Sequence, residues 1–344
     1  MRVLTVIPGR PDSAEVQERP EPDLRDGAVL VEGLLLGVCG TDVEIVQDGF
    51  GVPPPGSERM VLGHEALGRV LEPAGDLQAG DLVAGVVRRP DGCDACADDQ
   101  WDMCVGGEFV ERGITGADGY GATRWRADPR FVVRLDPALG DLGVLLEPTS
   151  VVAKAWEQIE RIGSRAWFRP RTVLVTGAGP IGLLAALLGV QRGLDVHVLD
   201  VVTDGPKPQL VADLGATYHA GPVADTGLRP DVVVECTGVG SLVYDCLEQV
   251  APNAVVALAG ISAGRAALDT SLSALSRDLV LSNEVVFGTV NAGRRHYAQA
   301  AEALGEADSD WLGRLITRRV PLAGWATALE RDPHDVKVVV DLQA

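Results

Sequence analysis

The chain contains 344 residues, of which 46% are hydrophobic, and it carries a formal net charge of −19. The length suits about two domains, and the apolar runs are shorter than the ~18 residues that a membrane helix requires. The negative field, without a Lys/Arg block, argues against a nucleic-acid partner. The first residues soon turn polar, so no secretory signal is expected and the predicted location is cytoplasmic.

The first half of the chain is predicted to form an irregular, strand-rich domain. Short β-branched and apolar runs span residues 28–38, 81–87 and 131–135. Segments rich in glycine and proline separate these runs, such as GVPPPGSE at 51–58 and GITGADGYGA at 113–122. Runs of this length, bounded by turn residues, are typical of strands.

Two stretches within this half suggest a metal site. GVCGTD at 37–42 contains Cys39, and LGHEALGRV at 62–70 contains His64 followed by Glu65. A catalytic zinc takes three protein ligands and keeps one position open. Glycines beside Cys39 and His64 allow sharp turns that bring the two side chains to one point, whereas an isolated histidine would more simply be structural.

Three cysteines crowd into the next segment. Cys93, Cys96 and Cys104 lie close together in a chain without an export signal. Such spacing favours metal binding over a disulfide framework.

From about residue 171 the pattern changes to that of a dinucleotide-binding unit. RTVLVTGAGPIGLLAALLGVQRGLDVHVLD, at 171–200, predicts a strand, a glycine turn, a helix and a second strand. Its glycines have G-x-G-x-x-G spacing, and Asp200 ends the second strand, where it is expected to bind the adenosine ribose. The predicted cofactor-binding residues are Gly177, Gly179, Pro180, Ile181, Gly182, Asp200, Thr237 and Gly238.

The segment after Asp200 predicts NAD rather than NADP. Val201 and Val202 follow the aspartate, with no nearby arginine to pair with a 2′-phosphate. Lys207 is the alternative, because it could still accept NADP. Further apolar strands at 230–240 and 253–261 alternate with helical stretches and predict a parallel sheet. From about residue 288 the sequence returns to the mixed pattern of the first half, so one domain is expected to contain both chain ends.

These motifs, in this order, resemble the zinc-dependent medium-chain alcohol dehydrogenases over nearly the whole length. VERGITGADGYGA, LLEPTSVVAKAWEQI and GTVNAGRRHY resemble more narrowly the glucose 1-dehydrogenase branch. The resemblance implies an α/β protein with a GroES-like β-rich catalytic domain (1–153 plus 288–344) and a Rossmann domain (154–287). It also implies a homodimer or homotetramer.

The resemblance further assigns the metal ligands. Cys39, His64 and Glu147 would bind the catalytic zinc, with Glu65 either orienting His64 or serving as an alternating ligand. Asp91, Cys93, Cys96 and Cys104 would bind a structural zinc, although Asp91 stands where the family has a cysteine; the alternative is a lobe that has lost its metal.

The remaining implied residues concern the sugar. Thr41 would relay the substrate proton, or merely cap a turn. The expected sugar contacts are Thr41, Glu111, Glu147, Asn291 and His296.

The predicted reaction is oxidation of an aldose, such as glucose or galactose, at C1 to the lactone with NAD(P). One alternative is the same chemistry on a cyclitol, amino sugar or other secondary alcohol. A zinc-free quinone or enone reductase and a non-catalytic nucleotide-binding scaffold are more remote, because neither uses the ligand set. The expected partner is thus a small sugar or polyol, with no membrane and no nucleic acid.

Overall fold

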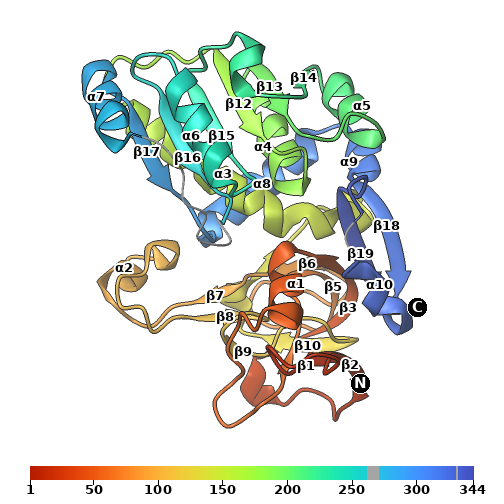
Figure 1. Cartoon of the computed structure of the whole chain (residues 1–344). Coiled ribbons are helices and arrows are strands. Elements are labelled where there is room, and N and C mark those ends of the chain that lie inside the picture. The colour runs from red at the N-terminus through yellow and green to blue at the C-terminus, as the bar shows by residue number, and fades with distance from the viewer. Residues whose placement is uncertain (262–270, 331) are drawn as a thin grey trace. The chain divides into compact units, whose positions relative to one another are not determined.

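The computed structural model describes residues 1–261, 271–330 and 332–344 (Figure 1). The chain divides into two compact units, one of Met1–Ser150 with Asn291–Ala344 and the other of Val151–Val290. No helix in the described part of the chain is long and apolar enough to cross a membrane.

The unit that contains both chain ends is built on a β-sheet with the strand order β11-β6-β5-β3-β19-β18, in which β10 also pairs with β3. Strand β3 lies in the middle of this sheet, and most of its residues are apolar and buried. The strands are β3 (Val29–Val38), β5 (Glu65–Glu72), β6 (Leu82–Gly85), β10 (Arg124–Ala127), β11 (Val132–Arg134), β18 (Ile316–Pro321) and β19 (Lys337–Asp341). The last strand of the sequence therefore pairs with one of the first.

Two smaller sheets and several short helices complete this unit. One sheet joins β2 (Glu15–Glu18), β1 (Arg2–Val6) and β4 (Met60–Val61), and the other joins β7 (Arg88–Arg89), β8 (Val110–Arg112) and β9 (Gly116–Ala117). The helices are α1 (Gly40–Gln47), α2 (Asp94–Ala97), α8 (Arg294–Glu306), α9 (Ser309–Leu315) and α10 (Trp325–Ala328). The frequent glycine turns explain why these elements are short.

The second unit is a parallel sheet with the order β14-β13-β12-β15-β16-β17. Its strands are β12 (Thr172–Thr176), β13 (Asp195–Leu199), β14 (Thr217–His219), β15 (Val232–Glu235), β16 (Val255–Leu258) and β17 (Val285–Gly288). The helices between them are α4 (Pro180–Gln191), α5 (Pro206–Asp213), α6 (Gly240–Gln249) and α7 (Leu272–Ser282), while α3 (Leu146–Gly163) enters from the first unit. The strand order reverses direction at β12 and β15, the point where such sheets bind ligands.

The predicted fold class is confirmed: a GroES-like domain accompanies a Rossmann sheet. Strand β15 is buried along its whole length, as expected for a parallel strand covered on both faces. Helix α4 is apolar on all sides and buries eight consecutive residues, Gly182 to Gly189. Within this unit, the Trp156 indole N–H of α3 donates to the Ala185 carbonyl of α4 at 3.1 Å.

Candidate active site

Strand pairing brings the candidate catalytic metal ligands together. Strands β3 and β5 are antiparallel, with Gly37 opposite Glu65. The end of β3 therefore lies beside the start of β5, and Cys39, just after β3, meets His64 and Glu65. One ligating atom from each of these three residues lies within 4.8 Å of the others. A thiolate, an imidazole and a carboxylate at this spacing form a suitable donor set for zinc.

Asp42 supports this group, and the sequence analysis missed it. Its Oδ2 accepts the Cys39 backbone N–H at 2.9 Å at the start of α1. Its Oδ1 lies 3.5 Å from His64 Nδ1, yet both atoms are buried without a hydrogen-bond partner among the described residues. Burial disfavours a charged imidazole, but the Asp42 carboxylate raises the pKa of His64 well above its ordinary value. A carboxylate behind a ligating histidine is a common way to orient it.

Glu147 and Thr41 lie near this group but do not share its spacing. Glu147, in the first turn of α3, is not among the three residues whose ligating atoms cluster within 4.8 Å. Burial, reinforced by Glu65, raises the pKa of Glu147 to about 7, whereas His64 and Lys337 act in the opposite direction. Thr41 Oγ1 lies 3.8 Å from Cys39 Sγ, so its hydroxyl stands beside the first ligand.

Glu111 and Asn291, two of the predicted sugar contacts, are in direct contact. The Asn291 amide donates to Glu111 Oε1 at 2.6 Å, and Asn291 has a left-handed backbone with φ of 61°. Arg88, opposite Glu111 in the β7–β8 pair, donates to the same oxygen from Nε at 3.0 Å and from Nη2 at 2.9 Å. All three of these donors end on Oε1.

His296 occupies a different environment. It is wholly buried at the start of α8, and its Nδ1 accepts the Gly293 N–H at 3.0 Å. The Asp102 carboxylate lies 3.9 Å from the same ring nitrogen. These contacts describe a histidine that holds the beginning of α8.

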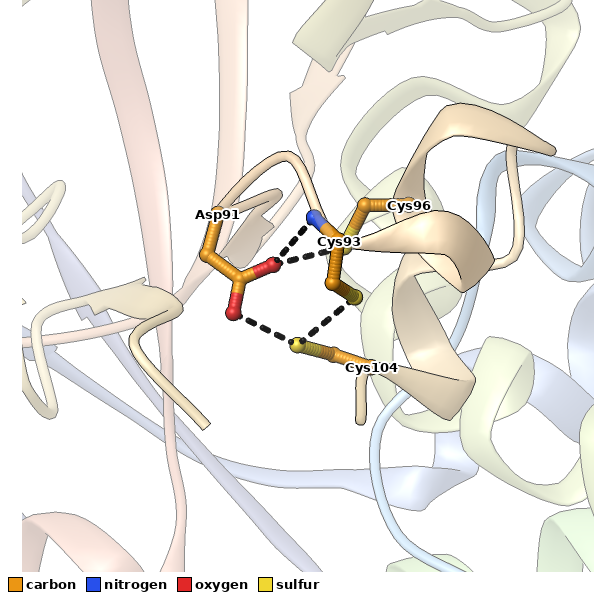
Figure 2. Close-up of side chains that lie close together, drawn as sticks. All are labelled: Asp91, Cys93, Cys96 and Cys104. Atoms are coloured by element: carbon orange, nitrogen blue, oxygen red, sulfur yellow. Dashed lines mark hydrogen bonds between the residues drawn. The ribbon is translucent and has the colours of Figure 1, made fainter. Parts of the chain in front are cut away.

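The cysteine segment forms a second potential metal site (Figure 2). One ligating atom from each of Asp91, Cys93, Cys96 and Cys104 lies within 4.8 Å of the others. The Cys93 and Cys104 sulfurs are 3.7 Å apart, and a tetrahedral zinc with ~2.3 Å bonds to sulfur has sulfur–sulfur edges of about 3.8 Å. Asp91 accepts from the Cys104 thiol at 3.1 Å and from the Cys96 thiol at 3.3 Å.

The electrostatics of this lobe fit a cation. Backbone N–H groups of Cys96 and Val105 lower the pKa of Cys93 and so favour its thiolate. Burial raises the pKa of Cys96 to about 12, so this thiolate needs a positive charge beside it. A side chain at Gly106 would overlap the Asp91 carboxylate, which shows that the loop is shaped around this fourth donor.

The glycine turn of the second unit has the geometry of a phosphate-binding loop. Gly177 follows β12 with φ of 88°, in the left-handed region. Gly179 caps α4 with an ordinary φ of −81°, and apart from its chain neighbours no described atom lies within 4 Å of where its Cβ would be. A side chain at Gly182 would overlap the Gly177 carbonyl oxygen. Pro180 and Ile181 form the first turn of α4, whose N–H groups are suited to an anion.

Asp200 lies beside this turn, just after β13. Its Oδ2 accepts the Ala178 N–H at 2.6 Å and lies 3.7 Å from Lys207 Nζ. Its Oδ1 accepts the Val202 N–H at 2.9 Å. The carboxylate therefore holds the glycine turn in addition to facing the expected ribose position.

Thr237 and Gly238 follow β15, the strand next to β12, and Glu235 fixes the loop that contains them. Glu235 is wholly buried at the end of β15 and pairs in register with Thr176 of β12. Its Oε1 accepts the Thr237 N–H at 2.7 Å, and its Oε2 accepts the Gly238 N–H at 3.1 Å. Glu235 carried no signal in the sequence beyond its place at a strand end.

Comparison with known proteins agrees with this arrangement. Residues 25–137 match the alcohol dehydrogenase GroES-like domain, and residues 140–342 match the glucose dehydrogenase C-terminus. The fold and the site define a medium-chain dehydrogenase of the zinc alcohol dehydrogenase superfamily. Within that superfamily, the chain belongs to the glucose dehydrogenase family. The predicted resemblance is therefore confirmed.

Relatives match the full length. The chain is 40% identical over 353 residues to glucose 1-dehydrogenase of Thermoproteus tenax, covering 100% of both chains. It is 37% identical over 350 residues to glucose 1-dehydrogenase 2 of Vulcanisaeta moutnovskia, covering 99% of both. A solved structure of Haloferax mediterranei glucose dehydrogenase in complex with NADP, Zn and gluconolactone has a TM-score of 0.92 and 32% identity, covering 99% of each chain.

Proposed function

We propose that the protein is a zinc-dependent glucose 1-dehydrogenase, which oxidises glucose at C1 to gluconolactone and transfers the hydride to NAD(P). The observation that carries this proposal is the convergence of Cys39, His64 and Glu65 within 4.8 Å in a chain of the glucose dehydrogenase family. The Haloferax mediterranei relative, described in complex with NADP, Zn and gluconolactone, supports the same chemistry.

We assign sugar and catalytic zinc binding to residues 1–153 plus 288–344, and NAD(P) binding to residues 154–287. Cys39, His64 and Glu147 would hold the catalytic zinc. When bound, zinc lowers the pKa of a coordinated hydroxyl, and the nicotinamide ring accepts the hydride. Thr41, whose hydroxyl lies beside Cys39, would relay the proton of the sugar hydroxyl, passing on its own hydroxyl proton as it accepts that of the sugar.

Glu111 is suited to bind a sugar hydroxyl. Arg88 and Asn291 give its Oε1 three N–H donors, which fixes the plane of the carboxylate. A charged carboxylate held in this way is a strong acceptor for hydroxyl donors. We propose that Asn291 and His296 also contact the sugar.

The proposal predicts that glucose and galactose support NAD(P) reduction, measured by absorbance of the reduced nicotinamide across a panel of aldoses and cyclitols. The sugar needs several fixed hydroxyl partners, so removal of single hydroxyls should raise KM. Absence of turnover with both aldoses, in zinc-loaded protein, would contradict the proposal. Turnover of a cyclitol instead would keep the mechanism and change the substrate.

Cofactor choice is tested at Asp200. We propose a preference for NAD, and Asp200→Ala is expected to weaken NAD binding by about 1.5–3 kcal/mol, the range of one lost charge-assisted hydrogen bond. NADP binding should weaken less, because Lys207 Nζ, 3.7 Å from the carboxylate, would be released toward a 2′-phosphate. Dissociation constants for both cofactors provide the measurement.

Lys207→Met is the matched control for Asp200→Ala. It should weaken NADP binding while leaving NAD binding nearly unchanged. Equal losses of NAD and NADP in Asp200→Ala would show that the carboxylate acts only by holding the glycine turn through Ala178.

We propose that Asp91, Cys93, Cys96 and Cys104 hold a structural zinc. Cys96→Ser should reduce the zinc content by one per chain and lower the melting temperature of the unit Met1–Ser150 with Asn291–Ala344, by about 2–4 °C for each kcal/mol lost in a unit of 150–250 residues. Glucose turnover per folded molecule should be retained, because the lobe supplies no catalytic ligand. Unchanged zinc content in this variant would show that the lobe is empty.

We also propose that the chain forms a homodimer or homotetramer, as the resemblance implies. Light scattering at working concentration measures the mass. A mass of 36.1 kDa, that of one chain, would contradict the proposal.

A further inference from the structure

Lys337 forms a buried ion pair with Glu65 beside the candidate zinc ligands. Lys337 is 1% exposed and Glu65 is 2% exposed. The lysine Nζ donates to Glu65 Oε2 and, at 3.1 Å, to the carbonyl of Val38. Val38 immediately precedes Cys39. The Lys337 ammonium therefore contacts the backbone next to Cys39 and the side chain of Glu65, both of which are candidate zinc ligands.

The sheet is built to let these two side chains meet. Strand β3 lies between β5 and β19, with Gly37 opposite both Glu65 and Val339. Neighbouring strands are about 4.8 Å apart, so residues on β5 and β19 need long side chains to meet across β3. A Cβ at residue 37 would overlap Glu65 Oε2, and glycine at this position therefore opens the path.

The charges near the Lys337–Glu65 ion pair explain why a buried cation is favourable there. Cys39 as thiolate, Asp42, Glu65 and Glu147 supply four formal negative charges, and the first three act electrostatically on His64 or Glu147. A zinc ion supplies two positive charges, and Lys337 supplies a third. Glu65 therefore has two possible cationic partners, the ammonium of Lys337 and a zinc ion bound beside it.

We propose that Lys337 is a positioning residue that competes with zinc for the Glu65 carboxylate and so keeps a zinc coordination position open for the sugar hydroxyl. This inference rests on the zinc site of the proposed function. It makes Glu65 an intermittent zinc partner whose approach Lys337 limits. A Lys–Glu pair with only a packing role would not control the metal.

The test measures release of zinc from the holoenzyme to an excess of chelator, together with kcat and KM for glucose. Lys337→Met frees Glu65 to bind zinc permanently, so catalytic zinc should leave about tenfold more slowly and kcat should fall at least about tenfold with little change in KM. Lys337→Arg keeps the charge and is the conservative control, with release close to that of the wild type. Faster or unchanged release in Lys337→Met would overturn the proposal, because simple destabilisation loosens the metal.

Glu65→Gln and the double variant Lys337→Met/Glu65→Gln complete the test. Without the Glu65 carboxylate, Lys337 and zinc no longer compete for one ligand. The double variant should therefore release zinc at the rate of Glu65→Gln. Persistent slow release in the double variant would overturn the proposal. The double variant also removes both buried charges, which proteins often tolerate. If Lys337→Met alone does not fold, Lys337→Gln, which also removes the ammonium, takes its place in the release measurement, and release as fast as in the wild type would overturn the proposal.

The two proposals can fail separately. If the wild-type chain neither retains zinc nor oxidises glucose, the proposed function fails. If it does both but Lys337→Met releases zinc as fast as the wild type, only the role of Lys337 fails.

Discussion

Cys39→Ser is expected to lower kcat/KM for glucose by about 10³-fold or more. A Lewis acid contributes several kcal/mol of transition-state stabilisation, and about 4 kcal/mol corresponds to ~10³-fold in rate. The serine hydroxyl is a poor zinc ligand at neutral pH, because it stays protonated where a thiol is readily deprotonated. Steady-state kinetics with metal analysis provide the measurement, and the zinc content should fall by one per chain.

The cofactor site should survive this change. The glycine turn belongs to the unit of Val151–Val290, whereas Cys39 belongs to the other unit, so the dissociation constant for NAD should stay near the wild-type value. Cys246→Ala is the matched control, because this thiol is buried on α6 and outside both candidate metal groups. Turnover within tenfold of the wild type in Cys39→Ser would contradict the assignment of Cys39 as a ligand.

Gly179→Val is expected to weaken NAD binding strongly while leaving the fold intact. The ordinary φ of Gly179 and the open space around its missing Cβ mean that folding does not require glycine there. A close approach of the cofactor pyrophosphate does require it. Steric overlap of about 3 kcal/mol would weaken binding roughly 100-fold, as measured by titration of the cofactor.

Gly182→Ala provides the contrast three residues later. Its new Cβ would overlap the Gly177 carbonyl oxygen, so the helix start must shift, at a cost of about 1–3 kcal/mol of stability. The melting temperature should fall in Gly182→Ala and stay near the wild-type value in Gly179→Val. An equal fall in both would show that Gly179 also serves folding.

Local patterns sufficed to predict the fold class and much of the candidate site. The spacing of Gly177, Gly179 and Gly182 between two apolar runs predicts a strand–turn–helix unit, because each position requires glycine for a different steric reason. Cys39 and His64 could be singled out because each has a glycine directly beside it. Asp91 and the three cysteines cluster because they are close in sequence.

The supporting residues could not be predicted, because their partners are set by strand register. Lys337 and Glu65 are 272 residues apart, and only the pairing of β3 with both β5 and β19 brings them together. Arg88 meets Glu111 through the β7–β8 register. In the sequence, Asp42 is an ordinary acidic residue of a first helical turn. Its position behind His64 depends on tertiary structure.

The place of β19 between β3 and β18 in the catalytic sheet affects how this protein folds during its synthesis. Cys39, His64 and Glu65 leave the exit tunnel long before Lys337. Until β19 arrives, Leu35–Val38 at the end of β3 lack their partner on one edge, although β10 pairs with Val29–Glu32 along the same edge. Nascent chains with such an unpaired strand are prone to misassociation. Lys337–Asp341 must therefore be synthesised before this edge of the metal-binding sheet can close, and chaperone occupancy should persist until β19 has emerged.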